Sequence, residues 1–95
     1  MSAYVVVDLE VLDKEKFEEY KQLVPGTIQM YGGRYVVRGG NVETLEGSWH
    51  PRRFVVVEFD SIEKAKAWYE STDYAKPKEI RQACTRSSII LVEGV

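Results

Sequence analysis

Three ionisable residues, Asp8, Arg38 and Glu58, interrupt segments of the chain that are otherwise rich in apolar residues. Two carboxylates beside one guanidinium, partly removed from water, form a group that can do acid–base chemistry. One carboxyl group can acquire a raised pKa and act as acid or base, while the other stays ionised against the arginine. The same group can equally be a buried ion-pair network that fixes an interface and carries no chemistry. The residue types leave both interpretations open.

Four apolar segments rich in β-branched residues predict the strands that would carry this group. They cover residues 4–11, 34–38, 53–59 and 87–93, and each is bounded by glycine, proline or short polar residues. Residues 41–45 are a candidate extension of the second strand along the sheet edge. Glycine pairs bracket the second strand, and alternation predicts that its two arginines, Arg34 and Arg38, point to the same side.

Helical spacing of apolar residues predicts the elements between the strands. Asp13 caps a helix that runs to Val24, and the following Pro25-Gly26 pair ends or kinks it, with a further helical turn over 28–31. Ser61 caps a second helix, whose buried side carries Ile62, Ala65, Trp68 and Tyr69. A short helix over 74–83 follows, with Pro77 in its first turn.

The order β-α-β-β-α-β predicts an α+β fold of the ferredoxin-like type in one domain over residues 1–95. We expect an antiparallel four-stranded sheet with the helices on one face, and the first and third strands side by side and parallel at its centre. If Val5, Val7 and Leu9 face the helices, Asp8, Arg38 and Glu58 form a row on the other face, across strands about 4.8 Å apart. A different assignment of faces would separate them.

The predicted central strands are apolar on both faces, although the helices can cover only one. Leaving valine, isoleucine and phenylalanine side chains in water forgoes roughly 1.5 to 3 kcal/mol for each. The simplest cover is a second copy of the chain, packed sheet against sheet. We therefore expect a homodimer that forms through the open sheet face and closes into an α+β barrel.

Several aromatic residues could form the wall of a ligand pocket between the helices and the sheet. The candidate ligand-binding residues are Tyr20, Trp49, Arg53, Trp68 and Tyr74. Ordinary core packing is the alternative for each aromatic residue. His50, in a loop before Pro51, is better interpreted as an exposed residue than as a base, and Cys84 as an inert thiol.

Composition excludes several classes of protein. The chain has 95 residues, a net charge of -2, one cysteine and one histidine, so no internal disulfide and no zinc-type spacing is expected. We predict no metal and no cofactor, a cytoplasmic location, and no membrane partner, since neither a signal peptide nor an apolar span is visible. Nucleic acid is not an expected partner either: the RNA-recognition signature needs glycine at Arg53 and an aromatic residue at Val56.

The sequence nevertheless resembles a known family over nearly its whole length. The resemblance rests on the segments 32–40, 45–49, 53–59 and 67–71, with Tyr74, Arg81 and the closing residues 92–94. These resemble the uncharacterised family catalogued as domain of unknown function 1330. The resemblance implies a dimeric α+β barrel, a fold class shared with cofactor-independent antibiotic-biosynthesis monooxygenases, muconolactone isomerases and ligand-sensing domains, and it implies no established activity.

Two functions stay open. The first is a cofactor-independent enzyme of the monooxygenase or isomerase type, acting on a small hydrophobic, oxygen-bearing metabolite, in which Glu58 or Asp8 handles a proton and Arg38 steadies an oxyanion. The second is a non-catalytic dimeric module that binds such a metabolite or only associates. A water-excluding pocket at Glu58 and Arg38 would favour the enzyme, and mutually satisfied charges would favour the structural role.

Overall fold

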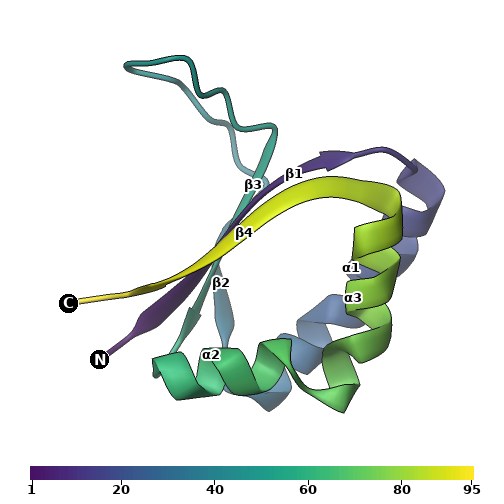
Figure 1. Cartoon of the computed structure of the whole chain (residues 1–95), viewed down its shortest axis with the longest axis vertical. Coiled ribbons are helices and arrows are strands. Elements are labelled where there is room, and N and C mark those ends of the chain that lie inside the picture. The colour runs from purple at the N-terminus through teal and green to yellow at the C-terminus, as the bar shows by residue number, and fades with distance from the viewer.

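The computed structural model describes all 95 residues, and they form four strands and three helices. In chain order these are β1 (Ala3–Val11), α1 (Lys14–Met30), β2 (Arg34–Arg38), β3 (Arg53–Phe59), α2 (Ile62–Tyr69), α3 (Thr72–Cys84) and β4 (Thr85–Glu93). The strands make one antiparallel sheet in the order β2-β3-β1-β4. All three helices lie on one side of the sheet, and the other face carries no helix (Figure 1). The predicted ferredoxin-like α+β fold is confirmed.

One detail of the predicted topology is wrong. The first and third strands are adjacent and central, as expected, but they run antiparallel, with Val5 opposite Val57. The α1 crossover brings β2 back in the direction of β1, with one strand position left between them. Strand β3 returns from β2 and fills that position, so it is antiparallel to both of its neighbours.

Helix α1 continues through the proline that was expected to end or kink it. The helix spans Lys14–Met30 and contains Pro25. Val24 and Ile28, on either side of Pro25, are both buried in the core, so packing outweighs the missing backbone donor. The Thr27 hydroxyl also donates to the Val24 carbonyl at 2.8 Å. The predicted start is confirmed, because the Asp13 carboxylate accepts from the Lys16 N–H at 3.2 Å.

In the second half of the chain, the predicted start of α2 is confirmed, and the predicted start of α3 is wrong. The Ser61 hydroxyl accepts from the Lys64 N–H at 3.1 Å and caps α2, as expected. Helix α3 begins at Thr72, capped by Ser71, so Pro77 lies inside the helix and not in its first turn. The expected strand at 41–45 does not form.

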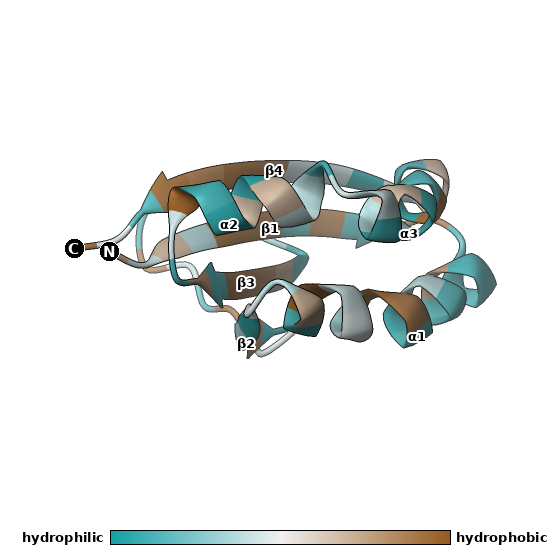
Figure 2. Cartoon of the chain, turned by 90° about the horizontal axis from the view of Figure 1, so that it is seen from below, coloured by the Kyte–Doolittle hydropathy of each residue, from teal (hydrophilic) through white to brown (hydrophobic).

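Alternation along β1 divides the sheet into a helix-covered face and an open face. Val5, Val7 and Leu9 are buried beneath the helices, as are Val57 and Phe59 of β3, which confirms the predicted face assignment for these two strands. Figure 2 shows the apolar colouring running along β1, β3 and β4. No helix of the chain combines the length and apolar character needed to cross a membrane.

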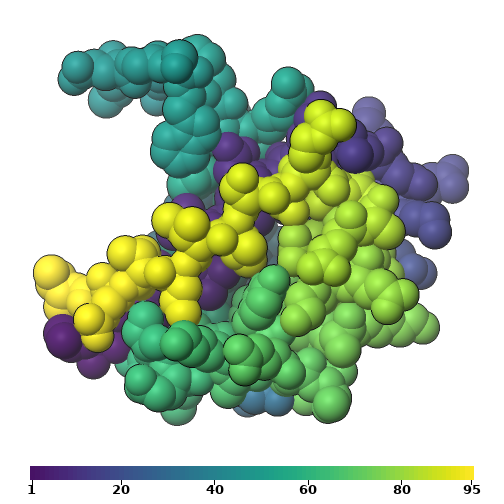
Figure 3. All heavy atoms as spheres, viewed as in Figure 1, coloured from purple at the N-terminus to yellow at the C-terminus, as the bar shows by residue number.

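The connection between β2 and β3, residues 39–52, forms an arm that projects beyond the open face. Figures 1 and 3 show the arm leaving the body of the molecule, with a hollow beneath it. The Thr44 hydroxyl donates to the Trp49 carbonyl at 2.8 Å and holds the tip together. Leu45, at the tip, is 91% exposed.

Candidate functional site

A β-bulge in β2 separates the two arginines that alternation placed on one side. Tyr35 pairs with Val57 and Val37 pairs with Val56, so Val36 is an extra residue in β2. Arg34 therefore lies opposite Glu58 on the open face, whereas Arg38 lies opposite Val55 on the helix-covered face. The predicted row of Asp8, Arg38 and Glu58 is wrong for this reason.

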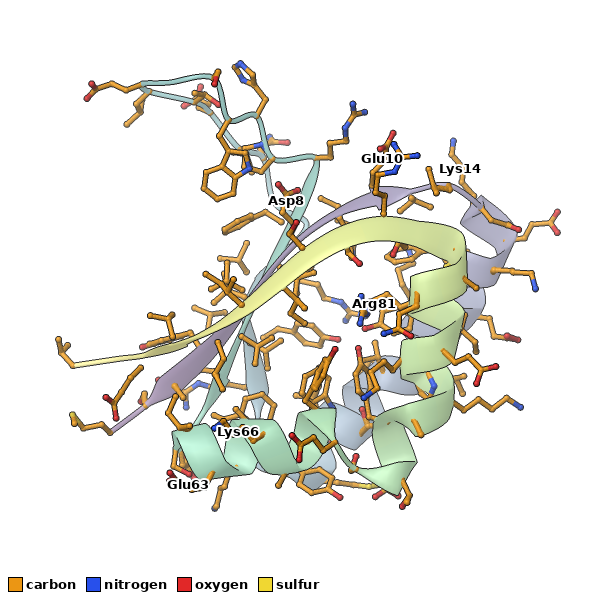
Figure 4. All side chains as sticks on the ribbon, in the orientation of Figure 1. Asp8, Glu10, Lys14, Glu63, Lys66 and Arg81 are labelled. Atoms are coloured by element: carbon orange, nitrogen blue, oxygen red, sulfur yellow. The ribbon has the colours of Figure 1, made fainter.

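The two carboxylates share the open face but do not meet. Asp8 lies opposite Phe54, and Glu58 lies opposite Tyr4, which is four residues from Asp8 along β1. Asp8 accepts two hydrogen bonds, from the Trp49 indole N–H at 2.8 Å and from the Arg52 backbone N–H at 3.1 Å. Figure 4 shows Asp8 on the side of the sheet that faces the arm. Asp8 and Trp49 thus tie the arm to the sheet.

Glu58 is satisfied by residues of the open face. Its carboxylate forms an ion pair with the Arg34 guanidinium and accepts a hydrogen bond from the Tyr4 hydroxyl at 3.3 Å. Hydrogen bonding from Ser2, and then the charge of Arg34, lowers the pKa of Glu58. A carboxylate held in the ionised form in this way is a poor general acid or base at neutral pH.

The helix-covered face encloses a cavity of about 40 Å³ between the sheet and α1, α2 and α3. Five of the predicted site residues line it, namely Tyr20, Arg38, Arg53, Trp68 and Tyr74. Asp8, Trp49 and Glu58 do not line it, because they belong to the open face or to the arm. Valine, leucine and isoleucine side chains, together with the ring of Phe17, form most of the remaining wall.

A chain of hydrogen bonds closes the deep end of this cavity. The Tyr20 and Tyr74 hydroxyls are 2.9 Å apart, and the Arg81 Nε donates to the Tyr74 hydroxyl at 3.3 Å. The Arg81 guanidinium also donates to the Ser87 hydroxyl at 2.7 Å. Burial raises the pKa of Tyr20, so its hydroxyl stays protonated. The deep end therefore offers hydroxyl groups backed by a cation.

Arg81 is unusual because it is only 3% exposed and has no carboxylate partner. Figure 4 shows its side chain pointing from α3 toward the sheet. A buried cation without a counter-charge is costly, and proteins retain one where the charge has a function. Its two hydrogen-bond partners, Tyr74 and Ser87, are both uncharged.

The side of the cavity nearest solvent, where Arg38 is exposed and Arg53 is half-buried, is its mouth, and it is also cationic. The Arg38 guanidinium lies 4.5 Å from the centre of the Tyr35 ring, and the Arg53 guanidinium lies 5.3 Å from the centre of the Phe17 ring. Neither arginine forms an ion pair, and the buried Nε of Arg53 has no hydrogen-bond partner. The cation–π contacts position both groups without neutralising them.

Sequence reasoning missed Arg81 and Tyr35 as members of the site. Arg81 follows Tyr74 by seven residues, which is two helical turns, so both lie on the buried side of α3. An arginine within a buried helical stripe is the signal that was available. Tyr35 was missed although alternation with Arg34 already places it on the helix-covered face, opposite Val57.

The two other reactive residues of the sequence lie outside the cavity. His50 belongs to the arm, where its Nδ1 is 3.0 Å from the Thr44 hydroxyl oxygen. Cys84 is fully buried at the end of α3, and burial raises the pKa of its thiol. No three histidine, cysteine or acidic residues gather in a way that could hold a metal ion.

The cavity is suited to holding negative charge on a ligand oxygen. Guanidinium groups and tyrosine hydroxyls donate hydrogen bonds in a site largely shielded from water, where such bonds are strong. No carboxylate and no histidine lines the cavity, so the lining groups that can relay a proton are the tyrosine hydroxyls and the amine of Lys21.

Solved structures with the same fold include proteins of unknown function and proteins described as oxygenases. A protein of unknown function from Rhodopseudomonas palustris superposes with a TM-score of 0.81 and 16% identity, over 99% of this chain and 82% of that one. A dimeric ferredoxin-like protein of unknown function from Jannaschia sp. CCS1 gives a TM-score of 0.73 and 13% identity, over 99% and 100%.

SnoaB, described as a cofactor-independent oxygenase from Streptomyces nogalater, gives a TM-score of 0.61 and 11% identity, over 99% of this chain and 93% of that one. These identities show a shared fold and nothing further. No curated protein sequence matches the chain. The model of the family described as "Domain of unknown function (DUF1330)" matches residues 2–95, and the chain therefore belongs to that family.

Proposed function

We propose that the cavity on the helix-covered face binds a small hydrophobic metabolite that bears an oxygen, and that the protein converts it without a cofactor. The observation that carries this proposal is the hydrogen-bond chain of Tyr20, Tyr74 and Arg81 at the end of an apolar cavity. Donors aimed into a dry cavity stabilise an oxyanion as it develops, which favours chemistry through an enolate or phenolate. The shared fold with a cofactor-independent oxygenase is consistent with this chemistry.

Within this proposal, Tyr74 is the group that meets the ligand oxygen, and Arg81 supports it. Tyr74 is fully buried, and its hydroxyl lies between the Arg81 guanidinium and the Tyr20 hydroxyl in the hydrogen-bond chain. Trp68 stacks on Tyr74, with ring centres 4.2 Å apart, and its indole N–H donates to the Thr27 hydroxyl at 3.0 Å. The Trp68 ring is therefore fixed on both sides and forms a rigid wall.

The second candidate function is a non-catalytic module that binds the same kind of metabolite. It is favoured by one observation, which is that no carboxylate and no histidine lines the cavity. An enzyme that abstracts a proton needs a group to accept it. The open-face carboxylates, Asp8 and Glu58, enter either function only as residues of the dimer interface and the arm.

We further propose that the protein is a homodimer assembled through the open face. Val6, Val56 and Ile90 are neighbours across the three strands β3-β1-β4 on this face, and Ile90 is 62% exposed. Contiguous apolar surface of this kind marks an interface. The relative from Jannaschia sp. CCS1 is described as dimeric. A cytoplasmic location is proposed because the only cysteine is a free buried thiol.

A thermal-shift screen tests the binding proposal. Neutral and anionic aromatic and α,β-unsaturated compounds are compared on the wild type and on Val55→Phe, in which a larger side chain enters the cavity lining. Compounds that raise the melting temperature of the wild type should lose their effect in Val55→Phe. They should keep it in Leu12→Phe, which changes an exposed residue away from the cavity. Equal effects in all three proteins would contradict the proposal.

A second measurement separates the enzyme from the binding module. Absorbance and dissolved oxygen are followed while each hit is incubated with the wild type and with Tyr74→Phe. The enzyme predicts consumption of the hit by the wild type and a loss of about 10² to 10⁴-fold in rate in the variant, with affinity changed much less. Binding without consumption of any hit identifies the non-catalytic module.

A further inference from the structure

The cations of the helix-covered face are divided between the two ends of the cavity. Arg81 lies at the deep end and is hydrogen-bonded to two uncharged hydroxyl groups. Arg38 and Arg53 lie at the mouth and have no ion-pair partner, and the buried Arg53 Nε has no hydrogen-bond partner at all. Lys21 also lines the cavity, but it is paired with Glu18 at 2.8 Å on the surface.

This distribution gives the two ends different chemistry. At the deep end the Tyr74 hydroxyl is the hydrogen-bond donor offered to a ligand. A single hydroxyl of this kind suits one carbonyl, phenol or enol oxygen. At the mouth two planar guanidinium groups have free donors, and such groups match the two oxygens of a carboxylate. The apolar wall between the ends suits an unsaturated or aromatic body.

We propose that the ligand is a two-ended organic acid, with a carboxylate held at the mouth by Arg53 and Arg38 and an uncharged or enolic oxygen at Tyr74 and Arg81. The inference rests on the proposed function, because it places its ligand in the same cavity. It goes further by specifying the charge of the ligand and its direction. The carboxylate faces outward, and the oxygen at which chemistry occurs faces inward.

The cavity is smaller than this ligand, so its mouth must open to admit it. Cavities that bind benzene measure about 150 Å³, whereas this one measures about 40 Å³. Arg38 is exposed and Arg53 is half-buried, and both are held mainly by cation–π contacts with Tyr35 and Phe17. Displacing such long side chains requires no change in the backbone, and a carboxylate would give them a charged partner in the displaced position.

Gly39 provides a second line of argument for the position of Arg53. Its φ is +71°, and a Cβ atom built on it would lie 2.5 Å from a terminal nitrogen of the Arg53 guanidinium. The chain thus leaves space beside the mouth, and the Arg53 guanidinium occupies that space. Arg52, the residue before Arg53, points to the open face and pairs with Glu10 at 3.5 Å. Arg52 therefore provides a matched control for substitutions of Arg53.

Isothermal titration with three probes of one shape tests the proposal. The probes are 4-hydroxycinnamate, its neutral amide, and cinnamate, which lacks the distal hydroxyl. We expect the wild type to bind 4-hydroxycinnamate at least tenfold more tightly than the amide, and several-fold more tightly than cinnamate. In Arg53→Gln the preference for the acid over the amide should fall at least fivefold, while the preference for the distal hydroxyl remains.

Two control variants define the outcome. Tyr74→Phe should lose the preference for the distal hydroxyl and keep the preference for the acid, and Arg52→Gln should keep both. Should Arg53→Gln not fold, Arg38→Gln, at an exposed position, serves the same purpose.

Equal binding of acid and amide to the wild type would overturn the inference and leave the proposed function standing. A preference for the acid that survives in both Arg53→Gln and Arg38→Gln would overturn it as well. Failure of all three probes to bind would count against the inference and the proposed function together.

Discussion

The two faces of the sheet differ in whether their charged side chains have a partner of opposite charge. On the open face the carboxylates of Asp8 and Glu58 are each satisfied by hydrogen bonds or an ion pair within the chain. On the helix-covered face the guanidinium groups of Arg38, Arg53 and Arg81 have no carboxylate partner. Satisfied charges stabilise a structure, whereas charges left without a counter-ion beside a cavity indicate a ligand. This difference supports the proposals that the open face forms the dimer and that the helix-covered face binds the ligand.

The largest expected effect comes from placing a charge in the middle of the open face. Val56→Asp should weaken dimerisation about 100-fold or more, because a buried unpaired carboxylate costs roughly 3 to 5 kcal/mol. Light scattering coupled to gel filtration measures the mass of both proteins. The variant should be monomeric or aggregated at concentrations where the wild type is a dimer, and a folded wild-type monomer at micromolar concentration would disprove the assignment of this face.

The next effect is expected on the other face, at the turn that follows β2. Gly39→Val should lower the free energy of unfolding by about 1 to 3 kcal/mol, because a β-branched residue is strained at a φ of +71° and its side chain would contact Arg53. Gly40→Val is the matched control, since its Cβ would meet no atom within 4 Å. Urea unfolding compares the two variants, and equal losses would show that the backbone at Gly39 is not strained.

A smaller effect tests the helix that carries Trp68 on the helix-covered face. Ser61→Ala should cost about 0.5 to 2 kcal/mol, because its hydroxyl accepts from the Lys64 N–H and caps α2. Ser48→Ala, in the exposed arm, should change stability by less than about 0.5 kcal/mol. Thermal unfolding by circular dichroism resolves this difference, and an unchanged melting temperature in Ser61→Ala would refute the cap.

The smallest effect concerns the pH dependence of the open face. The pKa of Glu58 is lowered in the folded chain, below the value of about 4.3 for an unfolded glutamate. Its contribution to stability is therefore complete above about pH 4.3 and is lost as the pH falls through the lower folded pKa. Urea unfolding between pH 7 and pH 3 should show a shallower loss for Glu58→Gln than for the wild type. Ser2→Ala should show an intermediate loss, and identical slopes in all three proteins would contradict the shift.

The sequence was sufficient to predict the fold and the two faces of the central strands. Strict alternation in β1 and β3 placed Val5 and Val57 beneath the helices, and no irregularity disturbs either strand. It was not sufficient for β2, because the bulge at Val36 depends on how β2 pairs with β3. This one extra residue places Arg38 on the opposite face, so Asp8, Arg38 and Glu58 do not form the predicted row.

The candidate site was predicted in part. Tyr20 and Trp68 were identified from helical spacing and Tyr74 from its place at the start of the helix predicted over 74–83, and all three line the cavity. Arg81 was missed because a charged residue near a helix end is usually exposed. Its two-turn spacing from Tyr74 could have indicated burial, but its hydrogen bond with Ser87 of β4 depends on how α3 packs against the sheet.

The two tryptophans permit a direct test of the claim that the ligand binds in the cavity of the helix-covered face, because one of them lies in that cavity and the other lies in the arm. Trp68 lines the cavity, and Trp49 belongs to the arm, where its indole N–H donates to Asp8 on the open face. Nitrogen–proton correlation spectra recorded during titration with 4-hydroxycinnamate report the two indole signals separately. The account predicts a saturable shift of the Trp68 signal and a constant Trp49 signal. A shift of the Trp49 signal while the Trp68 signal stays fixed would contradict it.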